Sequence, residues 1–83
     1  MPSSFVWTVG AVVAGSDFVV DITSAPCSPV TLRFYVNGAE VARGTVTPPG
    51  AHTFKCPSNA AGQTWTVVAE CPSSSDLKTG SVG

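Results

Sequence analysis

Side chains that could perform chemistry are few in this sequence and widely spaced. It contains three cysteines, Cys27, Cys56 and Cys71, and a single histidine, His52. Structural zinc sites usually draw two ligands from a short C-x-x-C pair, and no such pair is present. Because His52 would be the sole nitrogen ligand, the sequence predicts neither a metal site nor a bound cofactor.

Residues for nucleophilic or acid–base catalysis are equally sparse. The segment "AGSDF" contains a serine but not the G-x-S-x-G elbow that exposes a nucleophile. His52 alternates with apolar residues along an expected strand, which is typical of a structural histidine. Asp17 and Asp21 share one strand face, as in a weak calcium site, but further oxygen ligands are not apparent. We therefore expect a protein that is not an enzyme.

The composition indicates a small folded domain with little charge. Hydrophobic residues make up 43% of the 83 residues and charged residues 11%, against about 25% charged residues in ordinary globular domains. The four basic residues are scattered, so no clustered basic face is available for nucleic acid. The apolar run 5–15 is too short to span a bilayer, and "MPSS" before it lacks the basic residue of a signal peptide. We expect cytoplasmic synthesis, with no membrane or nucleic-acid partner.

Short runs rich in Val, Thr and aromatic residues, separated by Gly, Pro, Ser and Asn, predict an all-β protein. No window of helical length keeps an uninterrupted 3.6-residue apolar period. The expected strands cover residues 5–13, 18–24, 30–37, 39–46, 52–56, 64–71 and 77–82. Seven short antiparallel strands with short connections predict a single β-sandwich domain over residues 1–83, with short flexible termini.

Alternation along these strands predicts which side chains point into the core. The expected inward set is Phe5, Trp7, Val9, Phe18, Val20, Ile22, Val30, Leu32, Phe34, Val36, Trp65, Val67, Ala69 and Cys71. On the third strand, Thr31, Arg33 and Tyr35 face the opposite way. Since Tyr35 is the aromatic residue expected outside, these three residues are the candidate contacts with a partner protein.

The dipeptide Asn37-Gly38 predicts a two-residue type I′ hairpin, because both residues tolerate a positive φ. A three-residue loop would set Arg33 opposite Arg43, and like charges directly opposite are unfavourable. With the two-residue loop, a bulge at Gly44 would restore the alternation of an edge strand. The pairs expected from this register are Val36–Ala39, Tyr35–Glu40 and Phe34–Val41.

The segments "NGAEVARGTV", "PGAHTF" and "AAGQTWTVVAEC" resemble the second half of an immunoglobulin-like domain of the bacterial and phage type. Trp65 stands three residues after Gly62, where that family often carries its corner tyrosine. The resemblance covers residues 30–71, and it departs from the family in lacking a Trp on the third strand and a Cys within the second. It implies an immunoglobulin-like β-sandwich. Because such domains occur in phages as accessory virion parts, it also implies a place on a capsid or tail.

The strand order of a sandwich predicts one possible disulfide. Connections after the second, fourth and sixth strands gather at one end, which brings Cys27 and Cys71 together and leaves Cys56 at the other pole. Closing this loop would stabilise the fold by roughly 4 kcal/mol in the chain-entropy model. Cytoplasmic synthesis favours free thiols, whereas a particle outside the cell could be oxidised.

These observations favour a structural role over a catalytic one. The first expectation is an accessory decoration or cement protein that docks on the major capsid protein of a phage, at the virion surface, with a homo-oligomer as a further possibility. The alternative is a secreted or surface-displayed binding module for adhesion or glycan recognition. A surface of Ser, Thr and Gly suits either a free domain or one covered by neighbours. We expect the ends, "MPSS" and "KTGSVG", to lie along a neighbour and extend its sheet.

Overall fold

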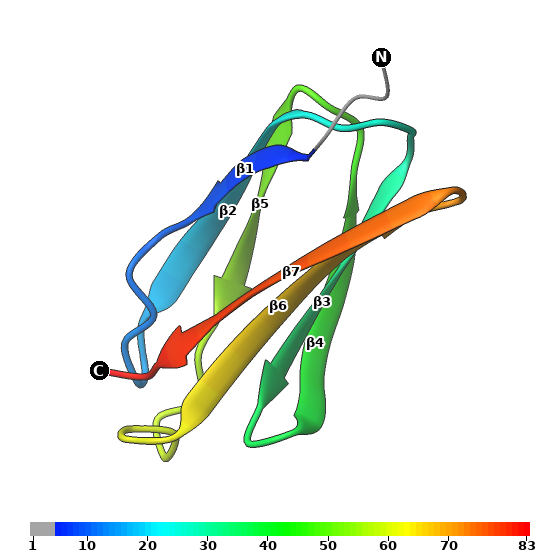
Figure 1. Cartoon of the computed structure of the whole chain (residues 1–83). Helices are drawn as coiled ribbons and strands as arrows, with labels where there is room; N and C mark the ends of the chain where they lie inside the picture. Colours follow the sequence, from blue (N-terminus) through cyan, green and yellow to red (C-terminus); the bar gives the residue numbers. More distant parts are fainter. Residues whose placement is uncertain (1–4) are drawn as a thin grey trace.

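Seven β-strands form two antiparallel sheets in the computed structural model, which describes residues 5–83. One sheet has the order β1-β2-β5 and the other the order β4-β3-β6-β7, and the two lie face to face (Figure 1). The strands are β1 (Val6–Val9), β2 (Asp17–Ser24), β3 (Val30–Val36), β4 (Ala39–Val46), β5 (Gly50–Lys55), β6 (Thr64–Cys71) and β7 (Ser74–Ser81). The expected all-β sandwich of about seven antiparallel strands is confirmed.

The connections separate into two groups at opposite ends of the sandwich (Figure 1). Those after β2, β4 and β6 gather at one end, and those after β1, β3 and β5 gather at the other. Hence Cys27, which follows β2, and Cys71, which ends β6, lie at the same end.

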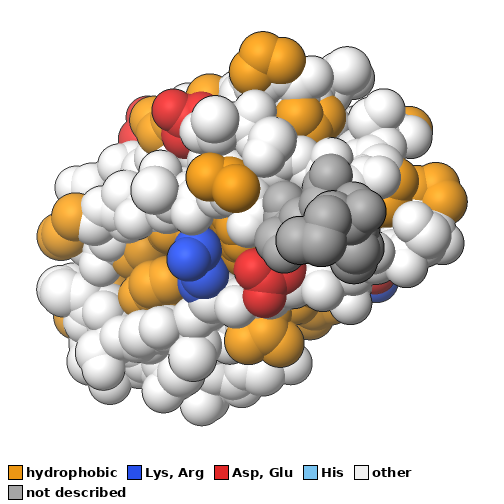
Figure 2. All heavy atoms as spheres, turned by 45° about the horizontal axis from the view of Figure 1, so that its top comes forward, with side chains coloured by type: hydrophobic (Ala, Val, Ile, Leu, Met, Phe, Trp, Pro, Cys, Tyr) orange, Lys and Arg blue, Asp and Glu red, His pale blue; other side chains and the backbone are white. Residues whose placement is uncertain are grey.

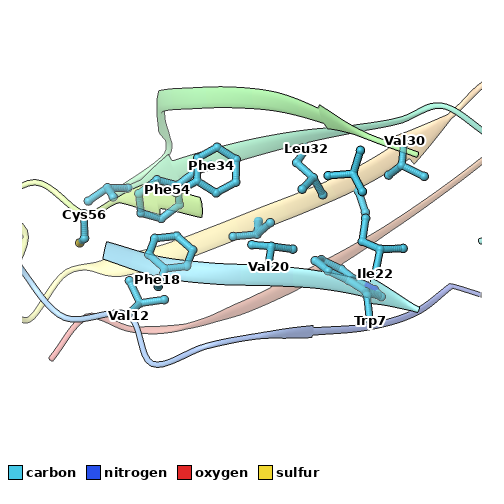
Figure 3. Close-up of a cluster of buried hydrophobic side chains, with 14 of the residues drawn as sticks. Trp7, Val12, Phe18, Val20, Ile22, Val30, Leu32, Phe34, Phe54 and Cys56 are labelled. Carbon is cyan, nitrogen blue, oxygen red and sulfur yellow. The ribbon is translucent and has the colours of Figure 1, made fainter. Parts of the chain in front are cut away.

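Alternating side chains of both sheets fill the space between them. On β2 and β3 every second residue is buried, as the period-2 apolar pattern predicts. Three phenylalanine rings form one end of the core, with centroids 4.8 Å apart for Phe18–Phe34 and 5.7 Å apart for Phe18–Phe54 (Figure 3). The buried Trp7 ring lies toward the other end, near Ile22 (Figure 3).

The second tryptophan is less buried than the alternation implies. Trp65 packs against the core but is only half-buried. Trp65 is opposite Gly80 on β7, and its ring packs over this glycine. Because glycine has no side chain, Gly80 does not shield the ring from solvent.

The β3–β4 hairpin has the expected turn but a bulge at an unexpected place. Asn37 and Gly38 both have positive φ, 53° and 84°, and the first two expected pairs are present. The register then shifts beyond Tyr35, so that Phe34 is opposite Ala42 and not Val41. The expectation of a bulge at Gly44 is therefore wrong.

Core packing explains why the bulge lies close to the turn and not at Gly44. It turns Ala42, Gly44 and Val46 toward the core side of β4, and Val46 is buried. It also sets Arg33 opposite Arg43, the arrangement that the expected register avoided. Each guanidinium has its own carboxylate partner, described below, which offsets the repulsion.

The C-terminal segment belongs to the fold. Residues expected to be a flexible tail form the end of β7 and continue into Val82, which is buried. The N–H of Gly83 donates to the carbonyl of Val12 (2.9 Å), and the N–H of Ala14 donates to the carbonyl of Gly83 (3.0 Å). The expectation of a free C-terminal tail is therefore wrong, because the chain after β1 leaves β2 and pairs with this end. The "MPSS" segment lies outside the described residues.

Candidate interaction surface

The outer surface of the β4-β3-β6-β7 sheet holds the three residues proposed as partner contacts. We call it the four-strand face. Thr31, Arg33 and Tyr35 lie half-buried along β3, the inner strand between β4 and β6. Pairing across the sheet adds Glu40, Arg43 and Thr45 from β4, Thr66, Val68 and Glu70 from β6, and Ser75, Leu77 and Thr79 from β7.

Arg33 is held by a carboxylate on the neighbouring strand. Its Nε lies 2.9 Å from Oε1 of Glu70, with both side chains a little over one-third exposed. The Nε–H does not point along this line, so the contact is an ion pair without a well-aligned hydrogen bond. An exposed pair of this kind contributes about 0–1 kcal/mol to stability, but it neutralises the charge that Arg33 would offer a partner.

Arg43 is neutralised in the same way within β4. Its Nη2 donates a 2.8 Å hydrogen bond to Oε2 of Glu40. This bond lowers the pKa of the Glu40 carboxyl and raises the pKa of the Arg43 guanidinium, because it favours the charged form of each. Both basic residues of the four-strand face are thus already paired.

Between and beside these ion pairs the four-strand face is apolar or carries hydroxyl groups. Val68 stands directly between Arg33 and Leu77 in one row across three strands. Leu77 is 57% exposed, the largest exposed fraction among the large hydrophobic residues of the described chain. Tyr35 lies in the next row, between Glu40 and the threonines of β6 and β7. Alternation on β3 indicates Tyr35 from the sequence, whereas Val68 and Leu77 join this surface only through the pairing of β6 with β3 and β7.

Outside this face, the remaining basic residues also have acidic neighbours. Lys55 is opposite Asp17 on the other sheet. Lys78 and Asp76 point to the inner side of β7, and both contact the Trp7 ring system. In the view of Figure 2, separate hydrophobic patches lie among uncharged atoms, with few charged side chains. The surface therefore offers apolar and hydroxyl contacts far more than charge.

The cysteines proposed as a disulfide are brought together. Cys27 and Cys71 form a disulfide with a Cα–Cα distance of 5.7 Å, and Ser73 Oγ lies 3.3 Å from Cys27 Sγ. Cys56 is fully buried and free, at the opposite end of the sandwich. Burial raises the pKa of its thiol, which makes the thiolate harder to form.

The part of the chain that the structure describes holds no group of three or more His, Cys, Asp or Glu side chains placed to bind a metal ion. Within residues 5–83 there is also no helix of the length and apolarity that a membrane crossing requires. No family model, curated protein or solved structure shows a significant match to this chain.

Proposed function

We propose that this protein is a non-enzymatic accessory structural protein, a decoration or cement protein that docks on the major capsid protein at the surface of a phage capsid. The observation that carries the proposal is the four-strand face itself. Its two arginines are neutralised within the chain, and Tyr35, Val68 and Leu77 supply apolar area between them. Such a face suits a site that a neighbouring protein covers.

The strand order supports assigning the domain to the immunoglobulin-like class. Strands β1, β2 and β5 correspond to A, B and E, and β3, β6 and β7 correspond to C, F and G, with β4 beside β3 in the place of C′. The Cys27–Cys71 disulfide joins the connection after β2 to the end of β6, whereas the B–F disulfide of antibody domains joins the two strands themselves. This assignment agrees with the resemblance of residues 30–71 to phage and bacterial domains, which is the source of the capsid proposal.

The charge arrangement determines how such docking would respond to salt. Exposed ion pairs add little to affinity and are screened by salt. Binding through Tyr35 and its apolar neighbours depends on buried area instead, and aromatic residues are enriched at the centre of interfaces. Attachment to a capsid is therefore expected to persist at high salt.

A sedimentation experiment tests this function. The purified protein would be mixed with phage capsids stripped of accessory proteins, at low and high salt, and the pelleted fraction would be measured. We expect co-sedimentation at both salt concentrations, a clear loss for Tyr35→Ala and no loss for Val19→Ala, an exposed position on the other sheet. Failure to sediment with capsids, or equal binding by Tyr35→Ala, would contradict the proposal.

The disulfide favours a second candidate function, a secreted or surface-displayed module for adhesion or glycan recognition. Disulfides persist in oxidising surroundings, which include both the outside of a released virion and the cell surface. A glycan array probed with the protein separates the two candidates. Saturable binding to defined glycans, without capsid binding, would favour the module.

A further inference from the structure

The edge of β7 that faces away from β6 is the edge best suited to pairing with a further β-strand. Of the four edge strands in the described chain, β1 has only four residues and an irregular register, and β4 contains the bulge. The open side of β5 lies against β4, where the His52 ring packs on Gly44. In contrast, β7 has eight residues and pairs with β6 without interruption.

The hydrogen bonds of β7 show which of its residues direct their backbone N–H and C=O groups to the open edge. The Leu77 N–H donates to Oδ1 of its own neighbour Asp76 (2.9 Å). Gly83 exchanges hydrogen bonds with residues 12–14, whereas the N–H of Val82 donates toward the β6 side. Because backbone groups alternate in direction along a strand, the odd-numbered residues of β7 direct their N–H and C=O groups to the open edge.

The side chains of β7 are complementary to themselves in one register. When two β7 strands run antiparallel with Leu77 opposite Leu77, each Asp76 is opposite Lys78 of the second copy. Odd-numbered residues then face odd-numbered residues, which is what the outward hydrogen-bonding groups require. Moving the centre by one residue would place Asp76 opposite Asp76, or Lys78 opposite Lys78, and like charges directly opposite are unfavourable.

We propose that β7 pairs with β7 of a second copy of this chain, antiparallel and centred on Leu77, to form a dimer with a continuous eight-stranded sheet. The pairing spans residues 74–80 of each copy. It is bounded on one side by the turn before Ser74 and on the other by the hydrogen bonds of Gly83 to residues 12–14. The 57% exposed Leu77 side chains meet on the outer surface.

Asp76 changes its partners when the dimer forms. In the single chain it accepts hydrogen bonds from the Trp7 indole and from the Leu77 N–H. Inward-facing charges and a capped amide are devices that protect a free edge from wrong partners. In the dimer, the Leu77 N–H donates to the Leu77 carbonyl of the second copy, and Asp76 gains Lys78 of that copy. The Asp76 carboxylate thus occupies the Leu77 N–H in the single chain, which hinders pairing with other strands. In the dimer it pairs with Lys78 of the second copy instead.

Two single charge variants test the register. Lys78→Asp places Asp opposite Asp76, and Asp76→Lys places Lys opposite Lys78, so each variant alone is repulsive. Their mixture restores two opposite-charge pairs in every heterodimer. We expect the wild-type protein to show a concentration-dependent mass of two chains by light scattering or sedimentation equilibrium. Each variant alone should dimerise about tenfold more weakly or worse, and the equimolar mixture should recover wild-type affinity.

Two controls and a second test variant keep this test independent of folding. Lys55→Asp makes the same charge change on the other sheet, and its dimer is expected to match wild type. Ser75→Pro removes an outward N–H without touching the β6 ladder, which edge strands tolerate, and it should also weaken the dimer. Thermal unfolding of every variant identifies any that fails to fold, and conclusions then rest on Ser75→Pro.

Three results would overturn the proposal. The first is a wild-type chain that stays monomeric at all concentrations, as expected if the edge takes a strand of a different protein. The second is a dimer that is unaffected by Lys78→Asp and Ser75→Pro, which would place the contact elsewhere. The third is a mixture of the charge variants that dimerises no better than either alone. None of these depends on capsid binding, so the function proposed above is tested separately.

Discussion

The indole N–H of Trp7 donates a 2.9 Å hydrogen bond to Oδ2 of Asp76, and this bond joins the two sheets along the side where β1 faces β7. Lys78 Nζ lies 5.2 Å from the centroid of the same indole. The inner side of β7 is polar, yet its charged groups have partners, because the buried tryptophan of the opposite sheet offers an N–H to one and a π face to the other.

Replacing Trp7 by Phe tests this contact. The variant keeps an aromatic ring in the core but removes the N–H, so the Asp76 carboxylate loses a donor. A hydrogen bond to a charged group contributes about 1.5–3 kcal/mol, and the smaller ring also leaves space around a buried core residue, so we expect a loss of this order or more. Urea unfolding measures it. Val6→Ala, at an exposed neighbouring position, should change stability by about 0.5 kcal/mol or less, and a similar loss in both variants would contradict the assignment.

The opposite side of the sandwich is closed by His52 of β5 lying on Gly44 of β4. A β-carbon at residue 44 would lie 2.5 Å from Cε1 of that imidazole, closer than packed atoms allow. We expect Gly44→Ala to destabilise the protein by about 1–3 kcal/mol, as overpacking does. Removing the ring with His52→Ala should restore part of this loss, so a double-mutant cycle should give a coupling of at least about 0.5 kcal/mol. Additive effects would show that the two residues do not interact.

These contacts indicate what the sequence could and could not predict. Strands β2 and β3 were recognisable because each buries every second residue, from Phe18 to Ile22 and from Val30 to Val36. Strand β7 begins three residues before the expected strand 77–82, since its inner side carries Asp76, Lys78 and Gly80, and no apolar alternation marks where it starts. Its role depends on Trp7, 69 residues away in the chain, and single-sequence patterns contain no such distant pairings.

The candidate surface shows the same limit. The outward direction of Thr31, Arg33 and Tyr35 follows from alternation on one strand, and the structure places them on the outer side of β3. The bulge was misplaced because both candidate positions restore alternation, and the choice between them depends on the packing of Val46 and on Glu70, which β6 brings beside Arg33. Neither the packing of Val46 nor the position of Glu70 can be inferred from the local sequence.

The Cys27–Cys71 disulfide should make a large contribution to the free energy of unfolding. Cys27 and Cys71 are 44 residues apart, and opening a loop of this length releases about 4 kcal/mol of unfolded-state entropy in the chain model. We expect the double variant Cys27→Ser/Cys71→Ser to lose stability of this order, and wild type to show the same loss when a reductant is added. The double variant itself should not respond to reductant. A thermal midpoint that is unchanged by reduction would contradict this expectation.

Cys56 should give the stability a pH dependence above neutrality. Burial raises the pKa of its thiol above the ordinary value of 9.0, so the folded protein keeps the proton where the unfolded chain loses it. Stability is then fully present below about pH 9 and falls as the pH rises from there toward the folded-state pKa. Urea unfolding between pH 7 and about 10.5 should show a steeper decline for wild type than for Cys56→Ala. Equal slopes would mean that this thiol does not contribute.

The C-terminal residues should matter for stability. Val82 is 4% exposed, and its backbone pairs with residues next to β6, while Gly83 pairs with the chain that follows β1. Burying a valine contributes about 1.5–3 kcal/mol, so we expect Val82→Ala to lose much of that amount and deletion of residues 82–83 to lose more, because backbone hydrogen bonds disappear as well. Val19→Ala, at a position 47% exposed on β2, is the matched control and should be nearly neutral. Chemical denaturation of the three variants measures the differences, and a shortened chain as stable as wild type would show that this end is a free tail after all.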